Sequence, residues 1–412
     1  MKQRILVAVA SLVLSALLLL LLPLGTPTTQ QTTATTGTTP PTTATPPSTT
    51  IPPTQPSEPG IVRLYSCDPA IRAVLAGLAA DYTTQTGTEV DILAPEEDGC
   101  QATLQRLLES EDPPTAFCVH SWQQLTHLEH TLLELKDTPL IALLRSEDMA
   151  IRVNGKLLAI PMGLQAYGLL YNAELTATAL TRSDIVEYGF TSLSTAVQIL
   201  KNNSIKAFPT PVPTAEDAWY LLALEEPVYA RAFLDLYLTN YNKSGDPLTE
   251  FLNGKAAFLP GGSWNYELLA SYTDRQFHVR NLDMVPTYVG GAMQYYCDWA
   301  WCINAGAREA DIEATTNFFC WMATVGQNST APIDQLQILT PFASSGWYAN
   351  QLEKKLLGYM STENAIVDFS DIPAESEHLL TAMNTYLQAP TDENWEQLRL
   401  CMESARAQLI PE

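Results

Sequence analysis

The stretch Phe251-Leu-Asn-Gly-Lys-Ala-Ala-Phe-Leu-Pro-Gly-Gly-Ser-Trp264 carries more structural information than any other part of the chain. It predicts the end of a helix that begins at Pro247, because Asn253-Gly254 supplies the left-handed residue that commonly closes a helix. The apolar run from Lys255 to Leu259 then predicts a short buried strand. Helix, strand and a following glycine pair together indicate an α/β fold.

The end of this stretch predicts a sharp turn at Pro260-Gly261-Gly262 and a new helix with Ser263 as its N-cap. This order places Trp264 outside the carboxyl end of a strand, which is where open α/β sheets bind their ligands. Two interpretations follow from the local pattern. Trp264 either contacts a ligand or packs the start of the helix without one.

The first 59 residues are expected to lie outside the folded part. Lys2 and Arg4 precede an apolar run from Ile5 to Leu24, which is long enough to span roughly 30 Å of hydrocarbon. Residues 1–25 therefore predict a transmembrane signal anchor or a signal peptide, and the missing A-x-A pattern favours the uncleaved anchor. Residues 26–59 are rich in Thr and Pro and predict a disordered stalk. We expect the protein at the extracellular face of the membrane, or secreted if the segment is cleaved.

The remaining chain, from Ile61 to Glu412, has roughly 350 residues, which is more than one core usually supports, so two lobes are expected. The net charge of −23 argues against nucleic acids and anionic membrane surfaces as partners. Seven cysteines outside the cytoplasm permit disulfides. Cys67 with Cys118 and Cys302 with Cys320 are two open pairings, and the sequence selects neither.

The apolar patterns alternate between strands and helices. Strands are expected at residues 61–66, 89–94, 114–119, 157–161, 168–172, 279–286 and 295–304. Helices are expected at residues 69–81, 100–108, 120–135, 193–201, 215–224, 228–238, 308–324 and 392–409. The alternation in the first half predicts a parallel sheet with right-handed crossovers.

The chain lacks the motifs of the common enzyme classes: it has no His-Glu-x-x-His, P-loop, Gly-x-Ser-x-Gly or dinucleotide fingerprint. His120, His127 and His130 allow a metal reading, but a polar helix face explains them with fewer requirements. Acidic pairs such as Glu96-Glu97 fit a solvated surface. We therefore expect no catalysis, no metal and no cofactor.

Aromatic and amide residues instead gather near the expected strand ends. Aromatic faces pack against the C–H faces of sugar rings, and amides bind hydroxyl groups, so this combination suits a carbohydrate site. Each aromatic residue taken alone fits a packed core more often than a sugar site, and Trp264, whose turn fixes its position, is the strongest candidate. The candidate ligand-binding residues are Trp264, Gln165, Tyr167, Trp122, Trp299 and Trp301.

Two segments resemble a known family. Residues 154–172, Asn-Gly-Lys-Leu-Leu-Ala-Ile-Pro-Met-Gly-Leu-Gln-Ala-Tyr-Gly-Leu-Leu-Tyr-Asn, are similar to the hinge-crossing stretch of extracellular solute-binding proteins of bacterial ABC importers. Residues 251–264 resemble the F-x-x-G-K-A-A-φ-x-x-x-G-x-W stretch of the same family, in its maltose-binding-protein-like sugar group (family 1). Trp264 matches the stacking tryptophan of that group. Gln165 stands where the maltose-binding protein has a glutamate, and Ser121 and Trp122 stand where it has charged residues, so its specificity does not transfer.

The resemblance implies a two-lobed periplasmic-binding-protein-like fold, with two α/β domains joined by a hinge. Residues 60–163 plus 285–335 form lobe 1 in this reading, and residues 164–284 plus 336–412 form lobe 2. The implied function is capture of a small solute, a carbohydrate, between the lobes for delivery to an ABC permease by a monomer. The alternative is a membrane-tethered receptor or sensor that uses the same fold without transport.

Overall fold

The computed structural model describes residues 59–181, 192–209, 227–240, 246–286, 288–289, 292–325, 338–343, 350–360, 365–368 and 376–409. The predicted anchor, nearly all of the predicted stalk and the expected helix at residues 215–224 lie outside these ranges, so they stay predictions. Within the described ranges, no helix is long and apolar enough to cross a membrane.

Eight of the described strands form the first sheet. They are β1 (Val62–Tyr65), β2 (Val90–Leu93), β3 (Ala116–Val119), β4 (Ile151–Val153), β5 (Lys156–Gln165), β9 (Tyr288–Val289), β10 (Ala292–Ile303) and β11 (Ala365–Asp368). The order is β2-β1-β3-β10-β5-β4, and β9 and β11 also pair with β10. β1 is parallel to β2 and β3, whereas β10 is antiparallel to β3 and β5. The predicted parallel unit is confirmed for β1 to β3.

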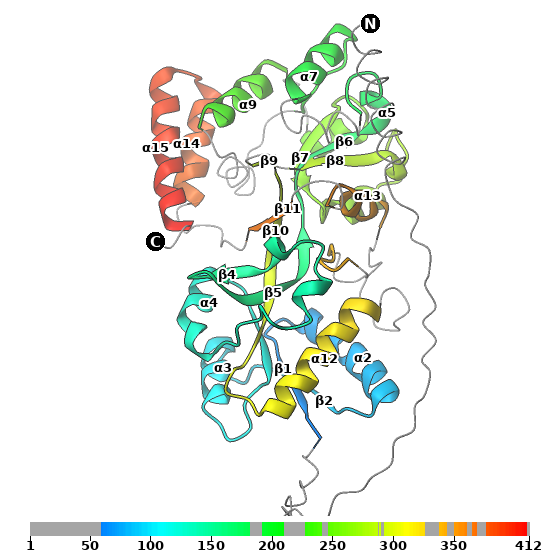
Figure 1. The fold of residues 1–412 in the computed structure, drawn as a ribbon. Helices are drawn as coiled ribbons and strands as arrows, with labels where there is room; N and C mark the ends of the chain where they lie inside the picture. Colours follow the sequence, from blue (N-terminus) through cyan, green and yellow to red (C-terminus); the bar gives the residue numbers. More distant parts are fainter. Residues whose placement is uncertain are drawn as a thin grey trace, which may run out of the picture. The chain divides into compact units, whose positions relative to one another are not determined.

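Helices cover both faces of this sheet (Figure 1). They are α2 (Pro69–Thr86), α3 (Cys100–Leu108), α4 (Trp122–Leu128) and α12 (Glu309–Val325). Leu64 of β1 packs in one core cluster with Leu75 of α2 and Phe318 of α12. The next residue, Tyr65, belongs to the other cluster, with Leu104 of α3 and Leu125 of α4. Successive strand residues point to opposite faces, so α2 and α12 cover one face and α3 and α4 the other.

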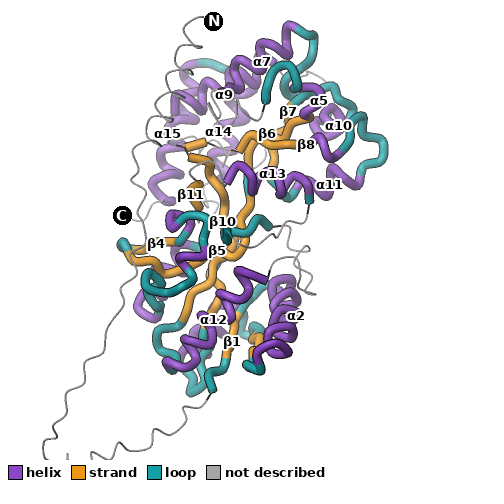
Figure 2. The backbone as a smooth tube through the Cα atoms, turned by 45° about the vertical axis from the view of Figure 1, so that its right-hand side comes forward, coloured by secondary structure: helices purple, strands orange, loops and turns teal. Residues whose placement is uncertain are grey.

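The second sheet has the order β7-β6-β8. Its strands are β6 (Tyr167–Asn172), β7 (Phe258–Gly262) and β8 (Leu282–Pro286). Figure 2 shows short helices around these strands. The remaining helices are α5 (Ala173–Thr176), α7 (Ser192–Asn202), α9 (Pro227–Asn240), α10 (Pro247–Leu252), α11 (Asn265–Ser271), α13 (Gln351–Met360), α14 (Ser376–Gln388) and α15 (Asp392–Leu409). Within the described residues there are also the 3-10 helices η1 (Glu129–Thr131), η2 (Ile141–Leu143), η3 (Glu147–Met149) and η5 (Val279–Asn281).

Several expected elements differ in extent from those observed. The helix expected at residues 120–135 ends at Leu128, where η1 and an irregular segment follow. Leu132 then forms a β-bridge with Asn304, so tertiary pairing of this segment with the end of β10 replaces helix continuation. The strand expected at residues 157–161 continues to Gln165 as β5. The sequence did not predict β4, β9, β11, α5, α13 or α14.

The predictions for the stretch from Phe251 to Trp264 have mixed outcomes, and the strand expected at residues 255–259 lies at Phe258–Gly262 as β7. Gly254 has a φ of 65°, as expected for the residue that closes α10. The predicted turn at Pro260-Gly261-Gly262 is wrong, because these residues belong to β7 and pair with β6. Pro260 is accepted because β7 lies at the edge of the second sheet, where a missing backbone N–H breaks no ladder.

The disulfide joins Cys67, which follows β1, to Cys100, the first residue of α3, with a Cα–Cα distance of 5.6 Å. Neither pairing left open by the sequence is therefore present, because Cys118, Cys302 and Cys320 are free thiols. The strands β1 and β2 are parallel neighbours, so the segments that leave their carboxyl ends lie close enough for a bridge.

Replacing both bridged cysteines, Cys67→Ser with Cys100→Ser, should lower the free energy of unfolding by about 2–4 kcal/mol. The reason is that the bridge closes a loop with a sequence separation of 33, which restricts the unfolded chain. Denaturant titration of the full chain measures the difference. Cys320→Ser, which removes a half-buried free thiol of α12, is the matched control and should change the midpoint much less. Equal midpoints for the double variant and the control would contradict a stabilising role of the bridge.

Candidate functional site

The site is built on the antiparallel pairing of β6 with β7, in which Tyr167 lies opposite Gly262. The pairing continues beyond the strands, because the N–H of Ser263 donates to the carbonyl of Ala166 at 2.8 Å. The N–H of Ala166 in turn donates to Oγ of Ser263 at 3.3 Å. The predicted N-cap role of Ser263 is therefore wrong: its hydroxyl accepts from Ala166, and the N-cap position of α11 belongs to Trp264.

Trp264 is half-buried and stacks on Tyr167, with ring centroids 5.9 Å apart and an interplanar angle of 30°. Tyr167 is only 1 % exposed, so it supports the indole from the buried side, while Trp264 keeps accessible surface. Gly262 leaves the space for this arrangement. A Cβ at that position would lie 2.2 Å from Cη2 of Trp264, well inside van der Waals contact. The ring of Tyr167 and the missing side chain of Gly262, which lie opposite each other on β6 and β7, together fix the position of the indole.

Gln165 is half-buried at the end of β5 and is separated from Tyr167 by one residue. Its neighbour Leu164 exchanges two hydrogen bonds with Leu339: the N–H of Leu164 donates at 2.8 Å and that of Leu339 at 2.7 Å. These bonds and those to Ser263 hold the crossing from β5 to β6 on both sides. Gln165, Tyr167 and Trp264 are thus brought together at the point where the chain passes between the two sheets.

Trp122 begins α4, directly after β3, and is half-buried against the core. The N-cap of α4 is Ser121, whose Oγ accepts from the N–H of Gln124 at 3.1 Å. The carboxyl ends of β1 and β3 lie at one edge of the first sheet, because the two strands are parallel. Trp122 therefore stands at the edge where open α/β sheets bind ligands.

Trp299 and Trp301 occupy a different environment. Trp301 is 1 % exposed and Trp299 is 8 % exposed, and both belong to the core cluster shared with α2 and α12. The ring of Trp301 lies 5.6 Å from that of Phe319. The two tryptophans are two residues apart on β10, so their side chains share the face that α12 covers. Both tryptophans therefore contribute to packing of the first sheet, and their role as ligand-binding residues stays a prediction.

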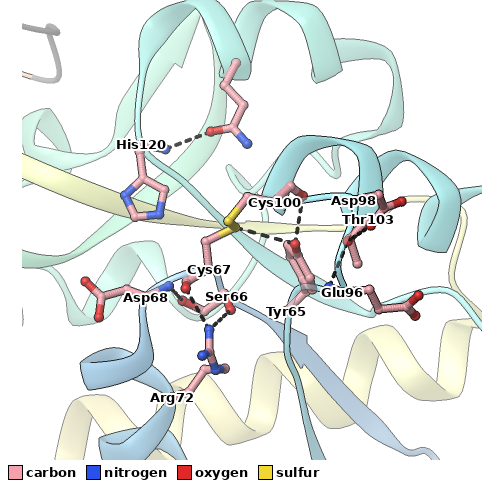
Figure 3. Close-up of a disulfide and its surroundings, with 11 residues drawn as sticks. Tyr65, Ser66, Cys67, Asp68, Arg72, Glu96, Asp98, Cys100, Thr103 and His120 are labelled. Atoms are coloured by element: carbon pink, nitrogen blue, oxygen red, sulfur yellow. Dashed lines mark hydrogen bonds between the residues drawn. A yellow bond between two sulfur atoms is a disulfide. The ribbon is translucent and has the colours of Figure 1, made fainter.

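A groove with a volume of about 830 Å³ lies between α3 and α4. Cys67 and Cys100 line one end of it, and His120, His127 and His130 all contribute to its surface. Figure 3 shows His120 and the disulfide together beside the ends of β1 and β3. Within the part of the chain that the structure describes, no group of histidine, cysteine and carboxylate side chains has the arrangement of a metal site. The three histidines are exposed and contribute to the polar surface of this groove.

Hydrogen bonds hold the disulfide end of this groove. The hydroxyl of Tyr65 donates to the carbonyl of Cys100 at 2.7 Å, and burial raises the pKa of this phenol, which keeps it protonated. Arg72 donates to the carbonyls of Ser66 and Cys67 at 2.8 and 2.7 Å. Asp68 caps α2 by accepting from the N–H of Ala70, so its carboxylate has a structural partner (Figure 3).

The sequence reasoning missed the disulfide and the amides of the groove. The groove amides are Gln101, Gln105, Gln123 and Gln124. A signal for both existed in the predicted elements. Cys67 directly follows one expected strand and Cys100 opens the helix after its neighbour, and the glutamines of residues 100–108 recur four residues apart, on one helix face.

Comparison with known proteins agrees with this arrangement. A family model described as bacterial extracellular solute-binding protein matches residues 77–345. No curated protein matches the chain by sequence similarity.

Solved structures share the fold at low sequence identity. A family 1 extracellular solute-binding protein from Bifidobacterium longum subsp. infantis has 14 % identity and a TM-score of 0.62, over 85 % of this chain and 100 % of that one. The bacterial solute receptor AcbH has 12 % identity and a TM-score of 0.64, over 85 % and 100 %. The GacH receptor of Streptomyces glaucescens GLA.O has 16 % identity and a TM-score of 0.50, over 85 % and 98 %.

The family model covers more than half of the 412 residues, and the folds of the solved proteins extend over most of the chain. The chain belongs to the bacterial extracellular solute-binding proteins.

Proposed function

We propose that the protein captures a carbohydrate between two lobes, outside the cytoplasm, and delivers it to an ABC permease. Lobe 1 comprises residues 60–163 plus 285–335 and carries most of the first sheet. Lobe 2 comprises residues 164–284 plus 336–412 and carries most of the second sheet, together with β11 of the first. The chain passes between the sheets at Ala166, where β5 is followed by β6. Closure of the lobes around this crossing buries the solute and creates the surface that a permease recognises.

The observation that carries the proposal is the half-exposed indole of Trp264, held on Tyr167 at the crossing. A flat aromatic face that keeps accessible surface and has a fixed position suits the C–H face of a sugar ring. Gln165 lies two residues before Tyr167 at the same crossing, and its amide can both donate to and accept from hydroxyl groups. The pair provides orientation and apolar contact and has no nucleophile or general base, which suits binding without chemistry.

The similar solved proteins support the substrate class. AcbH is described as having an exclusive preference for β-D-galactopyranose. GacH is described in complex with acarbose and an acarbose homologue. Both are sugar-like polyhydroxylated ligands, and both proteins share the fold of this chain. Trp122 and the polar residues around it, at the edge of the first sheet, are the proposed contribution of lobe 1.

A thermal-shift screen of the full chain against neutral sugars, peptides and polyamines tests the substrate class. A neutral sugar should raise the unfolding midpoint, because a ligand at 100 times its Kd stabilises the folded state by about 2.7 kcal/mol. Peptides and polyamines should leave the midpoint unchanged. A shift with a peptide or polyamine and none with any sugar would overturn the assignment to carbohydrates.

Trp264→Ala should weaken sugar binding at least tenfold, or about 1.4 kcal/mol, because the stacking surface is lost. Calorimetry with the sugar found in the screen measures this. Trp321→Ala is the matched control: Trp321 is also half-buried, but it lies on α12, where Nε1 donates to Gln85. Its loss should leave the affinity unchanged. Equal affinities of Trp264→Ala and the parent would remove Trp264 from the site.

Gly262→Ala should reproduce the effect of Trp264→Ala while keeping the indole in the protein. Its new methyl group would lie 2.2 Å from the present position of Trp264 Cη2, so the ring must move away from Tyr167. Gly306→Ala, whose Cβ would meet only Oδ1 of Asn304 at 3.2 Å, is the control and should bind as the parent does. If Gly262→Ala retains full affinity when Trp264→Ala does not, the exact position of the indole is unimportant.

A further inference from the structure

We propose that the groove between α3 and α4 is a second carbohydrate-binding site, which takes the additional units of a neutral oligosaccharide. The inference rests on the proposed function, since it extends the same ligand from the crossing onto the first sheet. The groove begins at Cys67 and His120, which follow β1 and β3. It therefore opens at the edge of the sheet that carries Trp122, and it continues outward between the two helices.

The lining of the groove has the chemistry of a hydroxyl-binding surface. Four amides, two hydroxyl groups and three imidazoles contribute to it: Gln101, Gln105, Gln123, Gln124, Ser121, Thr131, His120, His127 and His130. These groups both donate and accept hydrogen bonds, as each hydroxyl of a sugar does. The side-chain oxygen of Gln124 already accepts from the backbone N–H of His120 at 3.0 Å, which fixes this amide against the end of β3.

The charge of the groove excludes other ligand classes. Among the described residues that line it, none is a lysine or arginine, so a phosphate or sulfate group would find no permanently charged partner. Glu109 is the only carboxylate in that lining, which is too few for Ca²⁺ or a polyamine. In the described part of the chain, the three histidines form no group that could hold a metal ion. A neutral, polyhydroxylated ligand fits this composition.

The shape and size of the groove favour more than one sugar unit. Leu108 and Leu128, which are half-buried, provide apolar surface between the polar groups, as the C–H faces of pyranose rings require. The volume of about 830 Å³ lies near the upper end of the roughly 300–1,000 Å³ of ordinary ligand pockets. A single hexose would leave much of this space to water.

The groove is also held in its open form before any ligand binds. The disulfide fixes the start of α3 to the end of β1, and Oγ1 of Thr103 donates to Asp98 at 2.7 Å within the preceding loop (Figure 3). A site that is already ordered loses less conformational entropy on binding. The wall formed by α3 therefore presents Gln101 and Gln105, one helical turn apart, in a fixed position.

The test compares short and long sugars on the full chain. The double variant Gln101→Ala with Gln105→Ala removes two exposed amides from α3, and alanine keeps the helix favourable. The matched control is Gln388→Ala with Gln397→Ala, which removes two exposed amides from α14 and α15. The probes are glucose to maltotetraose, and galactose, melibiose, raffinose and stachyose, measured by calorimetry.

In the parent and the control, the longest member of the series that binds should bind at least tenfold more tightly than its monosaccharide. The groove variant should lose this gain and retain the affinity for the monosaccharide. Equal binding of long and short members by the parent would overturn the inference, as would an equal loss for both in the groove variant. Failure of the proposed function has a different signature, because no member of either series would then bind any of the proteins.

Discussion

The pairing of β6 with β7 is the constraint on which the candidate site depends. It joins two segments that lie almost one hundred residues apart in the chain, and the bonds between Ala166 and Ser263 extend it to the base of Trp264. A slip of one residue would move Trp264 away from Tyr167 and turn Gly262 to the opposite face. The same pairing anchors the crossing from the first sheet to the second, so the position of the indole and the connection of the sheets have one cause.

The two faces of the first sheet have different roles: one packs against α2 and α12, and the other lies under α3 and α4, which border the groove. Leu64, Cys118 and Trp301 point toward α2 and α12, where they form a closed core. Tyr65, Phe117 and Val119 point toward α3 and α4, which leave the polar groove between them. The alternation of side chains along each strand therefore decides which aromatic residues are core and which elements border a site.

The two proposed parts of the site differ in how they are held: one lies at the crossing between the sheets and the other lies on the first sheet alone. Trp264 and Gln165 lie beside the crossing, where movement of one sheet relative to the other would change their surroundings. The groove belongs to the first sheet alone and is braced by the disulfide and the hydrogen bond of Tyr65 to Cys100. In the proposed function, this arrangement lets the first sheet hold part of a ligand while closure brings the aromatic pair onto the rest.

The sequence by itself determined the local elements and the family. The helix at residues 100–108, the closing helix at residues 392–409 and the left-handed Gly254 follow from short-range patterns, because apolar periodicity and glycine conformation act within a few residues. The choice of Trp264 as the leading candidate for ligand contact also came from such a short-range pattern. Only the tertiary structure decided that Pro260-Gly261-Gly262 is an edge strand, that Ser263 bonds to Ala166, that Cys67 pairs with Cys100 and that Trp301 is core. Each of these depends on which distant segment lies opposite and which face it covers. The positions of Cys67 and Cys100 after neighbouring strands permit their bridge, but a short-range pattern does not select one long-range contact over another.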